Sequence, residues 1–307
     1  MTVADETAIE MVAPVERRRR PVIAAALEFA ESPLAVFGLV LFVALSLAAI
    51  LAPWISPQNP YDLMSLSLWD NYLPPGSTGA DGQYYILGTD AQGRDMLSAI
   101  LYGLRTSLFI ACLATFLAFV LGVTVGLIAA FVRGPVESIL MRIVDIQLSF
   151  PPMLIGLMLL AILGAGIDKI IIAVVAVAFA SYTRTCRAIA GVELAKDYVQ
   201  SAQCLVLPTR RILFRHVLPN CMPPLLVMAS VQIGSVIGLE ATLSFLGVGV
   251  PLTEPSLGSL ISIGFGYLMS GQYWITFFPG VALFLAILSI NLVGDRLRDV
   301  MNPRLKR

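Results

Sequence analysis

Six apolar stretches, each reaching or approaching the length of a membrane span, constrain the fold of this sequence more than any other feature. A transmembrane helix needs about 20 mainly apolar residues. Charged residues make up 13% of the 307 residues, whereas soluble domains carry about 25%. The apolar stretches lie at about 34–54, 108–131, 143–163, 170–182, 225–246 and 274–294. We therefore expect an all-α polytopic membrane protein with six transmembrane helices.

The basic residues favour one orientation, because they gather on the cytoplasmic side of membrane proteins. With six spans and both termini in the cytoplasm, only Arg94, Arg105 and Lys169 of the 20 basic residues lie outside. We expect the run from Arg17 to Arg20 to anchor the first tail near lipid head groups. The expected parts are a cytoplasmic tail (1–34), the first span with an external loop (35–104), a core of five spans (105–295) and a cytoplasmic tail (296–307).

A polar, basic segment at residues 193–220 interrupts the apolar stretches on the side predicted to be cytoplasmic. Asp197 is placed to cap a first short helix, with Gln200 in a capping-box-like pair, and Thr209 is placed to cap a second. A Leu-Pro pair separates the two helices, and Pro219 is expected to end the second.

Both short helices are predicted to be amphipathic. The apolar face of the first consists of Val199, Ala202, Leu205 and Val206. The apolar residues of the second are Ile212, Leu213, Phe214 and Val217, among arginines. Two such helices between membrane spans indicate a docking surface for a partner rather than a pore lining.

The form of this segment resembles the "EAA" loop of ABC-importer permeases, which a partner ATPase grips. Tyr198-Val199, Arg211-Ile212 and the run from Phe214 to Asn220 resemble the peptide and nickel permease group, in its dipeptide-type C subunit. The Glu-Ala-Ala of that family is Gln200-Ser201-Ala202 here, and its expected glycine is Val206. The resemblance implies a cytoplasmic docking loop at about 184–222, with ATPase contacts from Tyr198, Val199, Gln200, Ser201, Ala202, Val206, Arg210, Arg211 and Arg215.

A second stretch, Leu87-Gly88-Thr89-Asp90 with Gly93-Arg94-Asp95, resembles the same group near its external entrance. The two glycines permit tight turns, which Asp90, Arg94 and Asp95 could fix by short-range pairing. Direct contact with a peptide is the alternative. A third match to the family pattern lies at residues 291–299.

No part of the sequence predicts chemistry on ATP or on a metal. The phosphate-binding pattern GxxxxGK[ST] is absent, and His216 is the only histidine. The four cysteines are Cys112, Cys186, Cys204 and Cys221, and they show no metal-ligand spacing. We therefore expect no catalytic residues, no metal site and no cofactor in this chain, with ATP and Mg bound by partner subunits.

Polar residues inside spans are costly and are usually paired or functional. Gln232 and Glu240 lie in the fifth apolar stretch and are candidates for the substrate pathway. For Glu240, hydrogen bonds between helices and a substrate-lining role are equally open.

These features favour a type I ABC-importer permease fold in the bacterial inner membrane. The resemblance implies four kinds of contact: a homologous second permease, two ABC ATPases, an external substrate-binding protein and membrane lipid, with no nucleic acid. It implies di- or oligopeptides as substrate, with nickel chelates, glutathione or opines as alternatives. A stand-alone secondary transporter and a membrane scaffold or enzyme are the competing classes.

Overall fold

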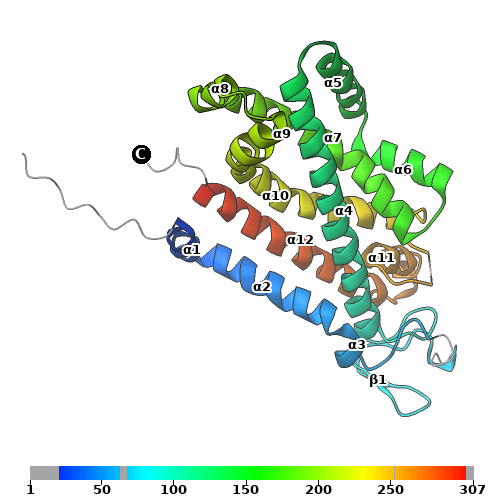
Figure 1. Cartoon of the computed structure of the whole chain (residues 1–307). Helices are drawn as coiled ribbons and strands as arrows, with labels where there is room; N and C mark the ends of the chain where they lie inside the picture. The colour runs from blue at the N-terminus through cyan, green and yellow to red at the C-terminus, as the bar shows by residue number, and fades with distance from the viewer. Residues whose placement is uncertain (1–20, 63–67, 252, 302–307) are drawn as a thin grey trace, which may run out of the picture.

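The computed structural model describes residues 21–62, 68–251 and 253–301, which form a bundle of long helices (Figure 1). Arg17 to Arg20, with their expected lipid anchor, and residues 302–307 of the second tail lie outside the described residues. The α-helices are α1 (Pro21–Ala30), α2 (Pro33–Ile50), α3 (Ala52–Ile55), α4 (Met96–Val132), α5 (Gly134–Ser149), α6 (Pro152–Leu163), α7 (Ile167–Glu193), α8 (Asp197–Cys204), α9 (Thr209–Arg211), α10 (Leu218–Phe245), α11 (Leu257–Phe265) and α12 (Trp274–Met301). Shorter elements are η2 (Leu68–Asp70), β1 (Ser77–Thr78), β2 (Tyr84–Tyr85), the π-helical η3 (Ile212–Val217) and η4 (Leu268–Ser270).

Five helical segments are long and apolar enough to cross a membrane, and α5 with α6 provides a sixth if the pair is counted as one bent span. The six-helix expectation is thus confirmed for the described residues, with differences in where the spans begin and end. Helix α4 starts at Met96 rather than near Leu108, because Asp95 caps it by accepting a hydrogen bond from the Ser98 amide at 2.8 Å. Helix α7 continues beyond Tyr182 to Glu193, as predicted.

The third span was expected as one helix over about residues 143–163, kinked at Pro151-Pro152, and the structure divides it into two helices. The chain bends by 95° between α5 and α6, at Phe150 and Pro151. Two consecutive prolines cause the break, since the residue before a proline avoids the α region and Pro152 then fits the first position of a new helix. The 12 residues of α6 extend only about 18 Å, less than the hydrocarbon core of about 30 Å.

The prediction that Pro219 ends the second short helix is wrong. One helical path of 37 residues runs from Thr209 to Phe245, through α9, the π turn η3 and α10. Pro219 falls in the first turn of α10, after the wider π turn, where a proline is tolerated. The second half of the docking loop and the fifth span are therefore one element.

The Gly-, Ser- and Pro-rich sequence of residues 247–272 predicts an external loop, with re-entry at the membrane surface as the alternative; the structure has the partly buried helix α11 there. Ser256 caps it, accepting from the Ser259 amide, while Ser259 Oγ accepts from the Ser256 amide at 3.0 Å. Leu257 and Leu260 of α11 pack in one core cluster with residues of α4 and α12. Helix α11 is thus part of the bundle.

Helices α4 and α7 make the most extensive contact between helices of the described residues, and glycines of α4 allow close packing there. A Cβ atom at Gly122 would lie 2.5 Å from the Cβ of Tyr182, and one at Gly126 would lie 2.7 Å from the Thr183 carbonyl oxygen. The Gly122-x-x-x-Gly126 spacing therefore has the packing role that such motifs have in membranes.

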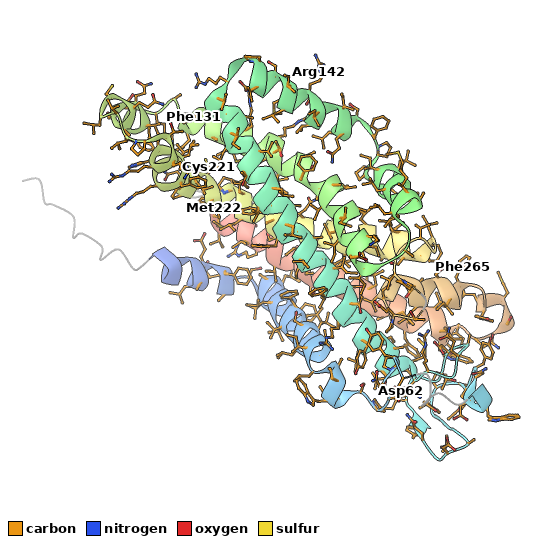
Figure 2. All side chains as sticks on the ribbon, turned by 45° about the vertical axis from the view of Figure 1, so that its right-hand side comes forward. Asp62, Phe131, Arg142, Cys221, Met222 and Phe265 are labelled. Atoms are coloured by element: carbon orange, nitrogen blue, oxygen red, sulfur yellow. The ribbon has the colours of Figure 1, made fainter. Side chains whose placement is uncertain are left out.

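The bundle has two distinct ends (Figure 1). Helices α8 and α9 lie at one, called here the docking end, and α3 with β1 lies at the other, called here the loop end. Figure 2 shows Phe131, Cys221 and Met222 near the docking end and Asp62 at the loop end. Helix α4 connects the two ends.

Candidate functional site

The docking segment, residues Asp197–Val217, has a buried face that anchors it to the bundle. Val199 is fully buried and Ala202 is 5% exposed. Both pack in one cluster with Ile212 and Val217, and with Leu127 of α4. Two of the predicted contact residues, Val199 and Ala202, therefore hold the segment in place instead of facing a partner.

The predicted helix caps in this segment are wrong. Asp197 and Thr209 are the first residues of their helices, and the cap positions are Lys196 and Pro208, without a side-chain capping bond. Gln200 does not close a capping box; its Nε2 donates to the Ala195 carbonyl oxygen at 3.2 Å.

The turn between α8 and α9 exposes apolar side chains that are close in sequence to exposed arginines. Leu205 is 74% exposed and Val206 87% exposed, although the sequence pattern placed both on the packing face. The helix ends at Cys204, so these residues leave the helical face that Val199 and Ala202 share. Phe214 of η3 is also exposed, and the exposed polar residues of the same segment include Gln200, Ser201, Arg210, Arg211 and Arg215.

Two of these apolar side chains, Leu205 and Phe214, were missed as site residues by the sequence analysis. Their signal was weak, since an apolar residue on a short amphipathic helix usually packs inward. Exposed apolar groups next to cations fit a surface that a partner protein covers.

Val206 adopts a left-handed backbone conformation, with φ of 52°. A β-branched residue disfavours this region, whereas glycine adopts it without strain. This is the position at which the resembled family has its glycine. The backbone geometry expected for a glycine is thus kept here by a valine.

Tyr198 connects α8 to the two helices that flank the segment. Its hydroxyl donates to Glu193 at the end of α7, and it accepts from Asn220 Nδ2 in α10 at 3.0 Å. Lys196 pairs with the same Glu193 at 2.6 Å. Burial, together with the Glu193 carboxylate, raises the pKa of Tyr198 to about 12, so the hydroxyl keeps its proton and continues to donate.

Two ion pairs link α5 to the second half of α7. Arg184 pairs with Asp145, and Arg187 Nε donates to Glu137 Oε1 at 2.7 Å. Both pairs are partly exposed, so their value for stability is small. Their effect is to fix the direction of α5 relative to α7.

At the loop end, the predicted pairing between Asp90 and Arg94 is present. Arg94 Nε donates to Asp90 Oδ2 at 2.7 Å, and both side chains are buried. Asp95 caps α4, and its amide donates to Gln58 Oε1 at 2.7 Å. Gly88 and Gly93 have φ of 79° and 73°, which the tight turns require.

Glu240 is completely buried among hydroxyl groups of three helical regions. Ser107 Oγ of α4 and Ser244 Oγ of α10 each donate to its carboxylate at 2.8 Å. Ser107 Oγ also accepts from the Leu257 amide at the start of α11, at 3.4 Å. Of the two roles considered for Glu240, hydrogen bonding between helices is the one this geometry favours.

Gln232, the other candidate pathway residue, lines a cavity of about 500 Å³ at the bend between α5 and α6. Gln147 lines the same cavity, and its Nε2 donates to the Val177 carbonyl oxygen at 3.2 Å. The structure thus leaves Gln232, and not Glu240, beside an open space. Within the described residues, no group of three or more His, Cys, Asp or Glu side chains could hold a metal ion.

Solved structures with the same arrangement of helices define the fold. Two crystal forms of the MetNI methionine ABC transporter, in inward-facing conformations, match with TM-scores of 0.54 and 0.55. Each is 19% identical in sequence and covers 67% of this chain and 97% of the matched chain. The fold is that of a type I ABC-importer permease.

Sequence comparisons then place the chain within this fold. Residues 122–307 match the family of binding-protein-dependent transport system inner membrane components, and residues 24–75 match the N-terminal membrane domain of oligopeptide transport permease C. The chain therefore belongs to the binding-protein-dependent transport system inner membrane component family, as a multi-pass membrane permease.

Relatives of similar length are named as peptide permeases. The di/tripeptide transport system permease protein DppC of Pseudomonas aeruginosa is 37% identical over 91% of this chain and 90% of its own length. The dipeptide transport system permease protein DppC of Escherichia coli K12 is 39% identical over 89% of this chain and 90% of its own. A putative peptide transport system permease protein of Brucella suis is 39% identical over 88% of this chain and 87% of its own length.

Proposed function

We propose that this chain forms half of the membrane pathway of a binding-protein-dependent importer for di- or oligopeptides. In this proposal a homologous permease supplies the other half, an external binding protein delivers the peptide, and two ABC ATPases bind ATP and Mg. The names of the relatives and their similarity over nearly the whole chain support the peptide substrate. No ATP-binding pattern exists in this sequence, so hydrolysis belongs to the partners.

The proposal of an ATPase contact rests on one observation, which is the exposed surface of the docking segment. Leu205, Val206 and Phe214 are apolar, exposed and close in sequence to Arg210, Arg211 and Arg215. A groove on an ATPase that accepts the apolar residues and carries acidic groups at its rim would be complementary to this surface. We propose that the docking end faces the cytoplasm, where ATP is present.

The way the segment joins the bundle suggests how a partner would move it. Helix α9, η3 and α10 are continuous, and Tyr198 ties α8 to both α7 and α10. Closure of the ATPases would therefore displace the docking end of α10 directly. The expected result is a switch of the pathway between inward-open and outward-open states.

Nickel chelates, glutathione and opines are less favoured substrates, since the three relatives described above are named for peptides. A stand-alone secondary transporter would need accessible ion-coupling carboxylates within the membrane. Glu240 does not provide one, because its carboxylate is buried and hydrogen-bonded by Ser107 and Ser244.

The test is to purify the tagged chain from its native membranes in mild detergent and to identify its partners by mass spectrometry. We expect a second six-span permease and one or two ATPases. The purified complex in vesicles, with its binding protein, should take up labelled dipeptide only when ATP is supplied.

Variants of the exposed arginines sharpen this test. Arg211→Glu should abolish ATP-dependent dipeptide uptake and lower ATPase recovery, because it reverses charge on the docking surface. Arg142→Glu, on the exposed face of α5, is the matched control and should retain uptake. Wild-type uptake by Arg211→Glu, or transport by the chain alone without ATP, would disprove the proposal.

A further inference from the structure

The loop end contains a groove that the proposed transport function does not use. Its volume is about 510 Å³, within the ~300–1,000 Å³ range of small-molecule sites. It lies where the last turns of α2 approach α4 and the start of α7. The apolar wall includes Phe42, Ile50, Leu108, Phe109 and Ile167.

One basic side chain lines this apolar groove. Arg105 lines it and is exposed. The other two basic residues that the charge pattern assigns to the external side are already paired, Arg94 with Asp90 and Lys169 with Asp168. Within the part of the chain that the structure describes, Arg105 has no hydrogen-bond or ion-pair partner.

The position of Arg105 along α4 places its side chain near the membrane surface. Helix α4 has 37 residues and is about 55 Å long, much longer than the hydrocarbon core of about 30 Å. Arg105 lies in its third turn from the loop end, and Ser46 and Ile50 lie in the last turns of α2. Tyr61, which also lines the groove, is a residue type enriched at the membrane interface.

We propose that this groove binds one anionic glycerophospholipid from the leaflet at the loop end. An acyl chain would occupy the apolar wall between α2 and α4, and the phosphate would bind the Arg105 guanidinium. Arginine matches phosphate by paired, charge-assisted hydrogen bonds. The Tyr61 hydroxyl is available as a second donor. The lipid would thereby fill the space between α2 and α4.

The test uses native mass spectrometry of the full chain, with phosphatidylglycerol or phosphatidylcholine added to the detergent micelles. Wild type should retain phosphatidylglycerol preferentially. Arg105→Gln should bind phosphatidylglycerol about tenfold more weakly, the factor contributed by an ordinary charge-assisted hydrogen bond. Lys169→Gln removes one external charge outside the groove wall and should behave as wild type.

Two further variants distinguish the headgroup from the groove. Ser46→Phe places a ring in the apolar space and should lower retention of both lipids. Arg105→Lys keeps the charge and should restore most of the preference for phosphatidylglycerol. Equal retention of both lipids by wild type, or unchanged retention by Arg105→Gln, would overturn the proposal.

A photo-crosslinking residue at Phe109, within the groove, tests the assembled complex in native membranes. Adducts with the mass of a phospholipid support the proposal. Adducts with a second permease in place of lipid would show that the groove is a subunit contact and would reject it. This measurement does not depend on the stability of any Arg105 variant.

Discussion

At the scale of single residues, Val206 shows how the docking segment departs from its family. A valine holds φ of 52° at a position that favours glycine, and such a conformation costs a β-branched residue about 1–2 kcal/mol. The neighbouring cluster of Val199, Ala202 and Ile212 maintains the turn in spite of this cost.

We predict that Val206→Gly increases the free energy of unfolding by about 0.5–1 kcal/mol, the strain relieved less the added entropy of the unfolded chain. Thermal unfolding of the purified protein in detergent would measure the shift. Leu205→Gly, at a residue with φ of −76°, is the control and should lower stability. A drop in both variants would show that Val206 is not strained.

A second residue-scale prediction concerns Gly122. Replacement by alanine should cost about 1–3 kcal/mol, because the new methyl group would meet Tyr182 and the Phe179 carbonyl oxygen and force α4 away from α7. The same thermal measurement applies.

Gly191→Ala, in α7, is the matched control for Gly122→Ala. Among the described residues, no atom outside the local backbone of α7 lies within 4 Å of a Cβ at that position, so alanine should be neutral or stabilising by up to about 1 kcal/mol. Equal losses in the two variants would contradict the importance of close α4–α7 packing.

At the scale of elements, the contact between α8 and a partner should require that α8 is an intact helix. Ala202→Pro introduces a proline into the interior of α8 at a buried position, at a cost of about 3 kcal/mol to the helix. We expect ATPase co-purification and dipeptide uptake to be lost while the chain still inserts in the membrane.

The control for this variant is Asp197→Pro, at the first residue of α8. A proline fits there, and the preceding Lys196 already has an extended backbone with ψ of 148°. Uptake should be retained. If Ala202→Pro transports like wild type, helix α8 is not needed for coupling.

The elements also show what the sequence could and could not predict. Hydropathy averages over about 20 residues and located the membrane helices. The Pro151-Pro152 pair indicated a kink in the third span, but not a break of 95° that divides it into α5 and α6. A proline was expected to end the helix at Pro219, but Pro219 follows the π turn η3 and lies in the first turn of α10, where a proline is tolerated. The pairing of Asp90 with Arg94 was predictable because it is local.

Exposure within the docking segment was harder to predict. Helical periodicity grouped Leu205 and Val206 with Val199 and Ala202, but the helix ends at Cys204 and the pattern no longer applies. The tertiary contacts of Glu240 depend on Ser107, 133 positions away in sequence, which no local pattern indicates.

At the scale of the whole molecule, the orientation of the two ends can be measured. Cys204 is exposed in the docking segment, and Asp81 is exposed at the loop end. In a background with Cys112→Ala, a membrane-impermeant maleimide added to intact cells should label Asp81→Cys and leave Cys204 unlabelled. After permeabilisation, both should react.

The two remaining cysteines, Cys186 and Cys221, are buried and provide an internal control, since they should stay unlabelled in the folded protein. Labelling of Cys204 in intact cells would reverse the proposed orientation and place the docking end outside. The ATPase contact would then be impossible at that surface.

The continuous helix from Thr209 to Phe245 has a thermodynamic consequence. Its 37 residues, from Thr209 to Phe245, extend about 55 Å and include both the exposed arginines of the docking segment and Gln232 beside the cavity. If ATPase binding at one end changes the affinity for cargo at the other, reciprocity requires cargo to change ATPase binding by the same factor. In an importer with such a helix, the binding of cargo would change the affinity for the ATPase before any ATP is hydrolysed.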